Sequence, residues 1–276
     1  MRRHELSDAE WEFVRPLLPV SLRGRKRLDD RRVLNGIVWK FRTGTAWRDV
    51  PERYGPWATL HTRFRRWAAD GTFDRMLQAA QAKADAAGDI EWLVSVDSTV
   101  VRAHQHAAGA RKGGLRVSAL GRSRGGLTSK IHLACDGQGR PLSFVVTGGN
   151  TNDCTRFTAV LEAVRVPRMG PGRPRTRPDH VLGDKGYSSK AIRAWLRRRG
   201  IPHTIPERTD QVGKRARRGS RGGRPPAFDR EVYKHRNVVE RCFNRLKQWR
   251  GIATRYDKTA QSYEAAITLA SLLMWA

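Results

Sequence analysis

Apolar residues in the first third of the chain recur every three or four positions, which is typical of helices that pack one face on a core. In the stretch LSDAEW, Ser7 and Glu10 stand at the spacing of a capping box and predict the start of the first helix. We expect that helix to run to about Leu18. Asp30 is expected to cap a second helix, which ends at Gly44.

A third helix is predicted after Gly55-Pro56. Its inward face is expected to carry four apolar residues, Trp57, Leu60, Phe64 and Trp67. Its outer face would carry two hydroxyl groups and two guanidinium groups, those of Thr59, Thr62, Arg63 and Arg66. This pattern is typical of a helix-turn-helix-like module, which would bind DNA through Arg63 and Arg66. A small helical bundle with solvated arginines explains the same pattern equally well.

From about residue 90 the pattern changes to short runs of β-branched and aliphatic residues, which predict strands. Three strands in meander order are expected at 92–101, 129–135 and 142–147. A helix at 157–164, a strand at 180–182, a basic helix at 189–199 and a strand at 201–205 follow. Two helices close the chain, one at 233–251 and an apolar one from residue 265. This order predicts a mixed α/β sheet flanked by helices and preceded by a small all-α domain.

Three segments contain too much glycine, proline and arginine to pack in a core. They cover residues 110–126, 168–178 and 213–226. We interpret them as basic loops without regular structure that are available to follow DNA phosphates.

Charge narrows the class of partner. The 276 residues include 54 Lys and Arg against 26 Asp and Glu, which gives a formal net charge of +28. This excess predicts a polyanionic partner, and nucleic acid fits better than a membrane because no basic amphipathic helix is left free. The three cysteines have no metal-binding spacing, and the first residues have no apolar signal core. We expect a soluble protein of a reducing compartment with no membrane partner.

The segment YKHRNVVERCFNRLKQWRG is strongly basic, yet it has one carboxylate, Glu240, near its middle. On a helical wheel its apolar side consists of Val239, Cys242, Phe243, Leu246 and Trp249. Four other side chains fall along one edge within an arc of roughly 60°, those of Tyr233, Arg236, Glu240 and Lys247. Taken alone, this edge is explained by an ordinary surface pair of Arg236 and Glu240, worth a few tenths of a kcal/mol.

Two further carboxylates emerge from predicted strands. In VSVDST, Asp97 follows a run of apolar strand residues. In LGDKGY, Asp184 comes at the end of the strand predicted at 180–182. An acid that leaves a buried strand is costly unless it is hydrogen-bonded, paired or bound to a metal ion. Ligands bind at the carboxyl ends of strands in open α/β sheets, so we expect Asp97, Asp184 and Glu240 to form one site.

Such a site would be anionic and built from oxygen ligands alone, which suits Mg²⁺ or Mn²⁺. Two ions about 4 Å apart would activate the attacking oxygen and stabilise the leaving oxygen of an in-line phosphoryl displacement. The surrounding arginines would then hold the DNA backbone.

Other polar residues are weaker candidates. Asp136 is expected to be a turn residue, and Asp153 a loop or helix-start residue. His104 and His106 would suit a zinc site if they lay on a strand, but the lack of a partner cysteine favours exposed or phosphate-contacting histidines.

The three acids stand in contexts that resemble the DDE transposases of bacterial insertion sequences, in the group with a Y-R-E-K signature. That signature (Tyr, two residues, Arg, three, Glu, six, Lys) is met in full by Tyr233, Arg236, Glu240 and Lys247. Asp97 in VDSTVVRAHQH matches the first acid, and Asp184 in GDKGY matches the second. The segments GRSRGGLTSKIHL, GNTND and LSDAEW…GTAWRDVPERYGPW also resemble this group, so the likeness covers nearly the whole chain.

The resemblance implies a ribonuclease-H-like catalytic domain at 90–276, preceded by a helical DNA-binding domain at 1–85. It implies that Asp97, Asp184 and Glu240 are catalytic and hold two divalent metal ions, Mg²⁺ or Mn²⁺. The activity implied is hydrolysis at the ends of a mobile element, followed by attack of the freed 3′-hydroxyl groups on target DNA.

The same resemblance implies the partners. Tyr233, Arg236 and Lys247 would contact DNA phosphate near the cleaved bond. The double-stranded DNA would be the terminal inverted repeats of the element and the target, bound by a homodimer because two ends are handled together. The protein would work in the bacterial cytoplasm, at the nucleoid.

Two other functions are compatible with parts of this pattern. A non-catalytic DNA-binding protein derived from a transposase would need the charge but not the acids. A ribonuclease-H-fold nuclease would share the site but would not join DNA ends. The three acids in matching contexts favour the transposase.

Overall fold

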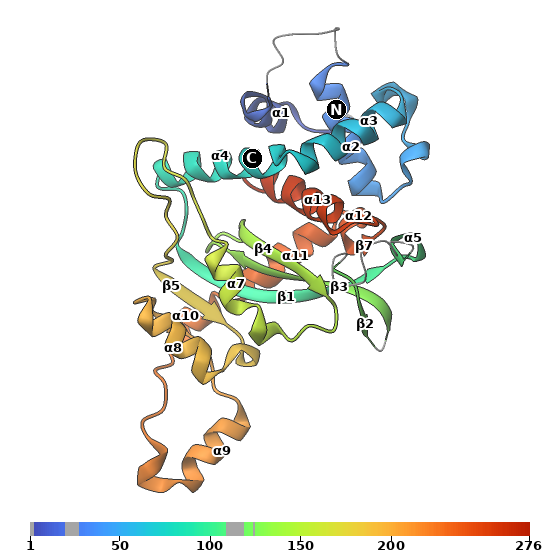
Figure 1. Cartoon of the computed structure of the whole chain (residues 1–276). Helices are drawn as coiled ribbons and strands as arrows, with labels where there is room; N and C mark the ends of the chain where they lie inside the picture. Colours follow the sequence, from blue (N-terminus) through green and yellow to red (C-terminus); the bar gives the residue numbers. More distant parts are fainter. Residues whose placement is uncertain (1–2, 20–27, 109–118, 124) are drawn as a thin grey trace.

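The computed structural model describes residues 3–19, 28–108, 119–123 and 125–276. A sheet of mixed strand direction lies at its centre with helices on its faces, and the N-terminal helices gather at one end (Figure 1). The expected fold class, a ribonuclease-H-like α/β sheet preceded by a helical region, is confirmed.

The sheet is built around the longest strand, β1 (Leu93–Ala103). On one side β1 pairs antiparallel with β3 (Gly126–Cys135), which pairs antiparallel with β4 (Pro141–Gly148). On the other side β1 pairs parallel with β5 (His180–Gly183), which pairs parallel with β6 (His203–Thr204). The meander and the two later strands are therefore as predicted.

Two short strands in the described part of the chain were not predicted from the sequence. β2 (Gly121–Ser123) forms a hairpin with the start of β3, and β7 (Thr254–Arg255) pairs with the last residues of β1. Each is only two or three residues long, so neither contains enough alternation to be recognised.

Four helices form the N-terminal region: α1 (Asp8–Val14), α2 (Asp30–Thr43), α3 (Trp57–Ala69) and α4 (Thr72–Ala86). The capping box of Ser7 and Glu10 is present, but α1 ends at Val14 and a 3₁₀ turn follows it. Asp29, rather than Asp30, caps α2, because its carboxylate accepts a hydrogen bond from the backbone N–H of Arg32. Gly44 ends α2 in the left-handed conformation as predicted, with φ of 73°.

Three of the four residues predicted for the inward face of α3 are buried. Leu60, Phe64 and Trp67 are buried, but Trp57 is 38% exposed, and the guanidinium group of Arg48 lies over its ring. Trp57 is the first residue of the helix, so its side chain lies beyond the end of the packed face. Helix α4 was not predicted, although the buried residues Phe73, Met76, Leu77 and Ala80 stand at helical spacing.

The second half of the chain adds helices on both faces of the sheet. They are α5 (Gln105–Ala108), α7 (Phe157–Glu162), α8 (Lys190–Arg198), α9 (Thr209–Arg217), α10 (Arg230–Lys234), α11 (Asn237–Lys247), α12 (Arg250–Ala253) and α13 (Ala260–Leu272). The prediction of one helix over 233–251 is wrong. The chain leaves α-helical geometry at His235 and Arg236, where backbone hydrogen bonds span three residues instead of four. The apolar side chains of α11 are buried as predicted.

The basic segments differ from one another. Residues 168–178 have no regular helix or strand, as predicted, apart from an isolated bridge between Val166 and Arg175. Residues 213–226 were predicted to lack structure, but they include part of α9 and a 3₁₀ turn at Gly219–Gly222. Of residues 110–126, 110–118 and 124 lie outside the described part, and much of the remainder belongs to β2 and β3.

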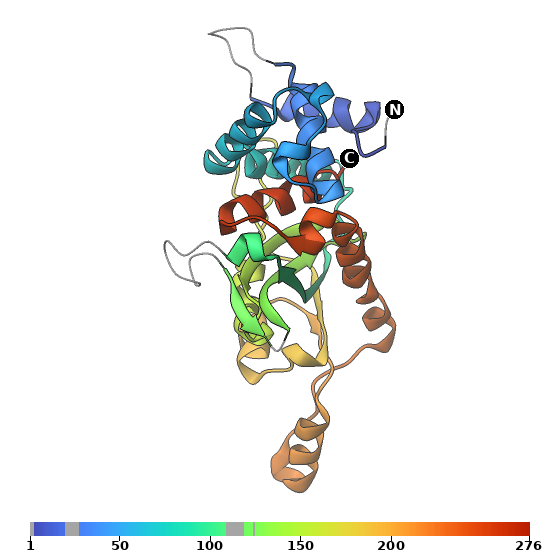
Figure 2. The same ribbon diagram turned by 90° about the vertical axis from the view of Figure 1, so that its right-hand side faces the viewer.

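Helix α9 has no buried residue and projects away from the body of the molecule (Figures 1 and 2). It is attached through Gln211, whose amide group donates to the carbonyl of Ser188 and accepts from its hydroxyl, both at 2.6 Å. This arrangement presents a helix of mostly polar and basic residues to solvent on a narrow connection.

The N-terminal helices and the sheet share one hydrophobic core. Helix α13 lies between them, next to α4 (Figure 1), and its residues Tyr263, Ala266, Ile267 and Leu269 are fully buried. An ion pair also links helix α2 to the segment between β7 and α13: the buried ammonium of Lys40 lies 4.0 Å from a carboxylate oxygen of Asp257. No helix in the described residues is long and apolar enough to cross a membrane.

Candidate active site

Asp97 and Asp184 are brought together by the parallel pairing of β1 and β5. Val96 stands opposite Gly183 in this register, and each acid is the next residue along the chain. Neighbouring strands lie about 4.8 Å apart, so the two carboxylates leave the sheet side by side. The backbone turns at once after Asp184, whose carboxylate accepts a hydrogen bond of 2.8 Å from the N–H of Gly186.

Asp97 is largely enclosed, with a side chain that is 20% exposed. One of its oxygens accepts a hydrogen bond of 2.8 Å from the N–H of Ser98, and the other accepts one of 2.6 Å from Arg236. Burial, helped by the carboxylates of Asp184 and Glu240, raises the pKa of Asp97 to about 6, although both hydrogen-bond donors oppose that rise. Burial, more than the neighbouring carboxylates, is therefore the reason that Asp97 holds its proton more tightly than a free carboxyl group does.

Glu240 reaches the site from α11, which packs on the sheet through Val239 and Cys242. Its carboxylate is 54% exposed and accepts a hydrogen bond of 2.8 Å from Arg236. The same guanidinium group holds Asp97, so Arg236 bridges two of the three acids. An ordinary surface pair does not describe this contact, since its second half joins residues 139 positions apart.

Lys247 and Tyr233 complete the edge that the helical wheel predicted. The ammonium of Lys247 donates to the hydroxyl of Thr99 at 2.6 Å and to the carbonyl of Val100 at 3.3 Å, and burial lowers its pKa. Tyr233 is half-buried beside Phe228, and burial raises its pKa. The four side chains therefore lie toward β1 and its neighbours despite the interruption between α10 and α11.

Thr99 was not singled out from the sequence. It stands two residues after Asp97 on the same strand, and alternate residues of a strand point to one face. That spacing was the available signal.

The donor set fits a hard divalent cation by its chemistry, since Asp97, Asp184 and Glu240 offer only carboxylate oxygens. Within the described ranges, however, no three histidine, cysteine or acidic side chains are gathered closely enough to hold a metal ion. Arg236 lies between Asp97 and Glu240 and separates them.

The weaker candidates have structural roles. Asp136 is fully buried in the turn before β4, and Arg140 pairs with it at 2.7 Å, as expected of a turn residue. Asp153 begins a 3₁₀ turn and pairs with Lys130 at 2.9 Å. His104 follows the end of β1 and His106 lies in α5, so the two histidines do not share a strand.

The two arginines expected to bind DNA on α3 differ in environment. Arg66 is exposed, as predicted. The prediction that Arg63 lies on the outer face is wrong, because its residue is only 8% exposed and its guanidinium pairs with Asp30 at 2.5 Å and lies over the ring of Trp67. Trp67 lies one helical turn after Arg63, but the pairing with Asp30, 33 residues away, could not be read from the sequence.

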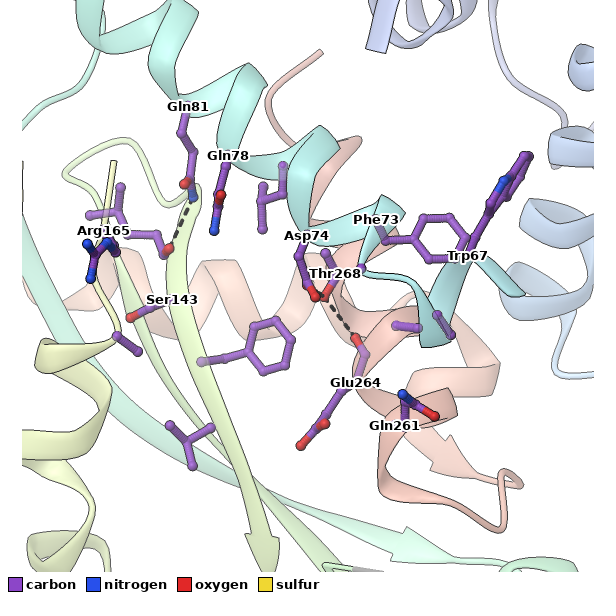
Figure 3. Close-up of a pocket in the computed structure, with 18 of the residues that line it drawn as sticks. Trp67, Phe73, Asp74, Gln78, Gln81, Ser143, Arg165, Gln261, Glu264 and Thr268 are labelled. Carbon is purple, nitrogen blue, oxygen red and sulfur yellow. Dashed lines mark hydrogen bonds between the residues drawn. The ribbon is translucent and has the colours of Figure 1, made fainter. Parts of the chain in front are cut away.

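A separate groove of about 550 Å³ lies between α4, α13 and β4 (Figure 3). Asp74 accepts a hydrogen bond of 3.2 Å from Thr268 there, and burial raises the pKa of Glu264. Its lining residues do not include Asp97, Asp184 or Glu240, so the groove is distinct from the carboxylate site.

Comparison with known proteins places this site in a family. A model of the transposase DDE domain matches residues 89–275, and a model of putative transposases of the IS4/5 family matches residues 6–77. An uncharacterised protein, y4sN, of Sinorhizobium fredii is 43% identical over 109 residues, which are 39% of this chain and 83% of that protein.

Two further relatives are named as transposases. The putative transposase for insertion sequence element IS402 of Burkholderia cepacia is 34% identical over 53% of this chain and 62% of its own length. The putative transposase for IS6501 of Brucella ovis is 29% identical over 54% of this chain and 98% of its own length. Because the DDE-domain model covers well over half of the sequence and contains all three acids, the chain belongs to the transposase DDE family.

Proposed function

We propose that the protein is an insertion-sequence transposase that cuts DNA at the ends of its element by metal-dependent hydrolysis and joins the freed 3′-hydroxyl ends to target DNA. The observation that carries the proposal is that Asp97 on β1 stands beside Asp184 after β5 and shares the guanidinium group of Arg236 with Glu240 on α11. Membership of the family and the printed names of the IS402 and IS6501 relatives support it.

Asp97, Asp184 and Glu240 would be the catalytic acids and would hold Mg²⁺ or Mn²⁺, with two ions expected. When bound, such ions activate the attacking oxygen and stabilise charge on the leaving oxygen. The chain orients two of the acids itself, because the N–H groups of Ser98 and Gly186 each fix one carboxylate oxygen. Above about pH 6 Asp97 is ionised and able to serve as a ligand.

The positive side chains around the acids would hold the substrate. Arg236 binds Asp97 and Glu240, and Lys247 binds Thr99, two residues beyond Asp97. Together with Tyr233, they would contact DNA phosphates near the cleaved bond. The net charge of +28 provides the long-range attraction for double-stranded DNA.

The chain would divide into a DNA-binding region at 1–85 and a catalytic domain at 90–276. The two family models match residues 6–77 and 89–275, so the division between them falls close to the proposed boundary. Arg66 on α3 would contact the terminal inverted repeats, and Arg63 would support α3 from within. Two element ends must be handled together, which favours a homodimer on DNA.

The test is cleavage and joining of DNA that carries the source element's ends, with Mg²⁺ or Mn²⁺. Glu240→Gln should bind the ends but neither cut nor join them. Glu231→Gln is the matched control, because this exposed carboxylate on α10 pairs only with Lys234 among the described residues. Cleavage by Glu240→Gln at the rate of the unchanged protein would refute the proposal.

One observation favours a second candidate, a non-catalytic DNA-binding protein. Arg236 already neutralises Asp97 and Glu240, as a residue of purely structural value would. Tight end binding without cleavage in both the unchanged protein and Glu240→Gln would establish this candidate. A simple nuclease would cut the ends but yield no joined products.

A further inference from the structure

We propose that Arg236 is a resident cation in the metal site, which a divalent ion must displace from the carboxylates in order to bind. The inference rests on the proposed function, since it takes Asp97 and Glu240 to be ligands. Its basis is the position of the guanidinium group, which donates to Asp97 at 2.6 Å and to Glu240 at 2.8 Å.

The two contacts use the atoms that a metal ion would need. Nη2 of Arg236 binds Oδ2 of Asp97, and Nη1 binds Oε1 of Glu240. The other oxygen of Asp97 already accepts from the N–H of Ser98. A planar guanidinium fork sets the separation of two carboxylates as well as their charge, so it stands where a shared cation would stand.

The position satisfies Arg236 only in part. Its Nε is buried and has no hydrogen-bond partner among the described residues. No hydrogen bond or ion pair in the described structure joins Arg236 to Asp184, so the third acid is left to attract another cation. A buried N–H without an acceptor is unfavourable, and a phosphate oxygen of DNA would supply one.

The backbone allows Arg236 to move without moving Glu240. Arg236 lies at the junction of α10 and α11, where hydrogen bonds span three residues. Helix α11 is anchored independently, by its buried residues Val239 and Cys242 and by the contact of Lys247 with Thr99. Reorientation of the guanidinium would open the site to metal and offer the same group to a phosphate, so metal and DNA would each strengthen binding of the other.

The test is the affinity of DNA-free protein for Mn²⁺, measured by electron paramagnetic resonance of the free ion. If the guanidinium occupies the site most of the time, Arg236→Gln should bind Mn²⁺ about tenfold more tightly than the unchanged protein. The matched control is Lys185→Gln, which removes an exposed charge next to Asp184 that forms no ion pair within the described residues. That change should alter the affinity less than about twofold.

Other variants separate the possible failures. Arg236→Lys keeps the charge but lacks the planar fork, and it should also gain affinity; it replaces Arg236→Gln if that variant does not fold. Equal affinity in the unchanged protein and both Arg236 variants, with binding lost in Asp97→Asn, would overturn the displacement but leave the metal site standing. Mn²⁺ binding that is indifferent to Asp97→Asn would overturn both. An equal gain in Lys185→Gln would reduce the effect to general charge and overturn the displacement.

Discussion

The ammonium group of Lys247 donates a hydrogen bond of 2.6 Å to the hydroxyl of Thr99, two residues along β1 from Asp97. A second contact, of 3.3 Å, goes to the carbonyl of Val100. The last turn of α11 is thereby tied to the strand that carries an acid of the site. An ammonium group has three donors, so one remains for a DNA phosphate.

Lys247→Ala is expected to weaken DNA binding and to reduce the slope of log affinity against log salt by about one. The physical reason is the loss of one phosphate contact. Thr99→Val is the matched variant, because it removes the hydroxyl partner and keeps the ammonium; its slope should stay unchanged. A normal slope for Lys247→Ala would instead restrict Lys247 to holding α11 on β1.

Replacing Arg66 by alanine should affect DNA binding, whereas replacing Arg63 by alanine should affect stability. Arg66→Ala removes an exposed cation, so it should reduce the salt slope by about one and leave the free energy of unfolding nearly unchanged. Arg63→Ala breaks the pair with Asp30 and should lower the free energy of unfolding by about 1–2 kcal/mol. Urea unfolding and DNA titration of the two variants check this, and a loss of stability for Arg66→Ala alone would reverse the assignment.

The projecting helix α9 should act on DNA binding without supporting the fold. Replacing Lys214 and Arg217 of α9, together with Arg218 directly after it, by Gln should reduce the salt slope by about two to three. The melting temperature should not change, because no residue of α9 is buried. A lower melting temperature, or an unchanged slope, would show that the helix packs on the body or does not contact DNA.

His132 should make the protein sensitive to mild acid. Its side chain is buried beside Asp153 and forms a hydrogen bond with the hydroxyl of Thr147. Burial lowers the pKa of His132 to about 4. The unfolded chain, with an ordinary pKa near 6.5, binds the proton more readily. The contribution of neutral His132 to the free energy of unfolding is therefore fully present above about pH 6.5 and is lost as the pH falls toward 4. At about pH 5 the loss is about 2 kcal/mol.

The measurement is the difference in unfolding free energy between about pH 7.5 and pH 5, for the unchanged protein and for His132→Gln. The variant should lose less stability over that interval. The raised pKa of Asp97 gives a slope of opposite sign between about pH 4 and 6, but both proteins share it, so it cancels in the comparison. Equal losses in the two proteins would exclude His132 as the source.

Features with a local cause could be predicted from the sequence. Ser7 caps α1 and Gly44 ends α2 through contacts within one turn, and the apolar spacing around Val239 requires a packed face whatever lies opposite. The sequence also predicts that Asp97 and Asp184 lie together, but the reason differs for Asp97. Asp184 follows the end of β5, whereas Asp97 lies in the middle of β1, at the point where its parallel pairing with β5 ends. Their catalytic role stays a prediction.

The remaining features depend on distant neighbours. Arg63 is buried because Asp30, 33 residues earlier, lies beside it, and no property of α3 alone reveals that. Arg236 was assigned to a helix edge with Glu240, while its second contact, to Asp97, required the fold of the whole catalytic region. The interruption at His235 has no glycine or proline to mark it.

The core shared by α13, the N-terminal helices and the sheet fixes the spacing between those helices and the carboxylates on the sheet. Because α3 and β1 belong to one packed unit, base pairs held by α3, as we propose, would be presented to the carboxylates at a set distance and rotational phase. The proposed position of the cut relative to the recognised sequence would then be a property of the protein rather than of the DNA. Inserting half a helical turn of about five base pairs between them would turn the scissile phosphate to the far side of the duplex.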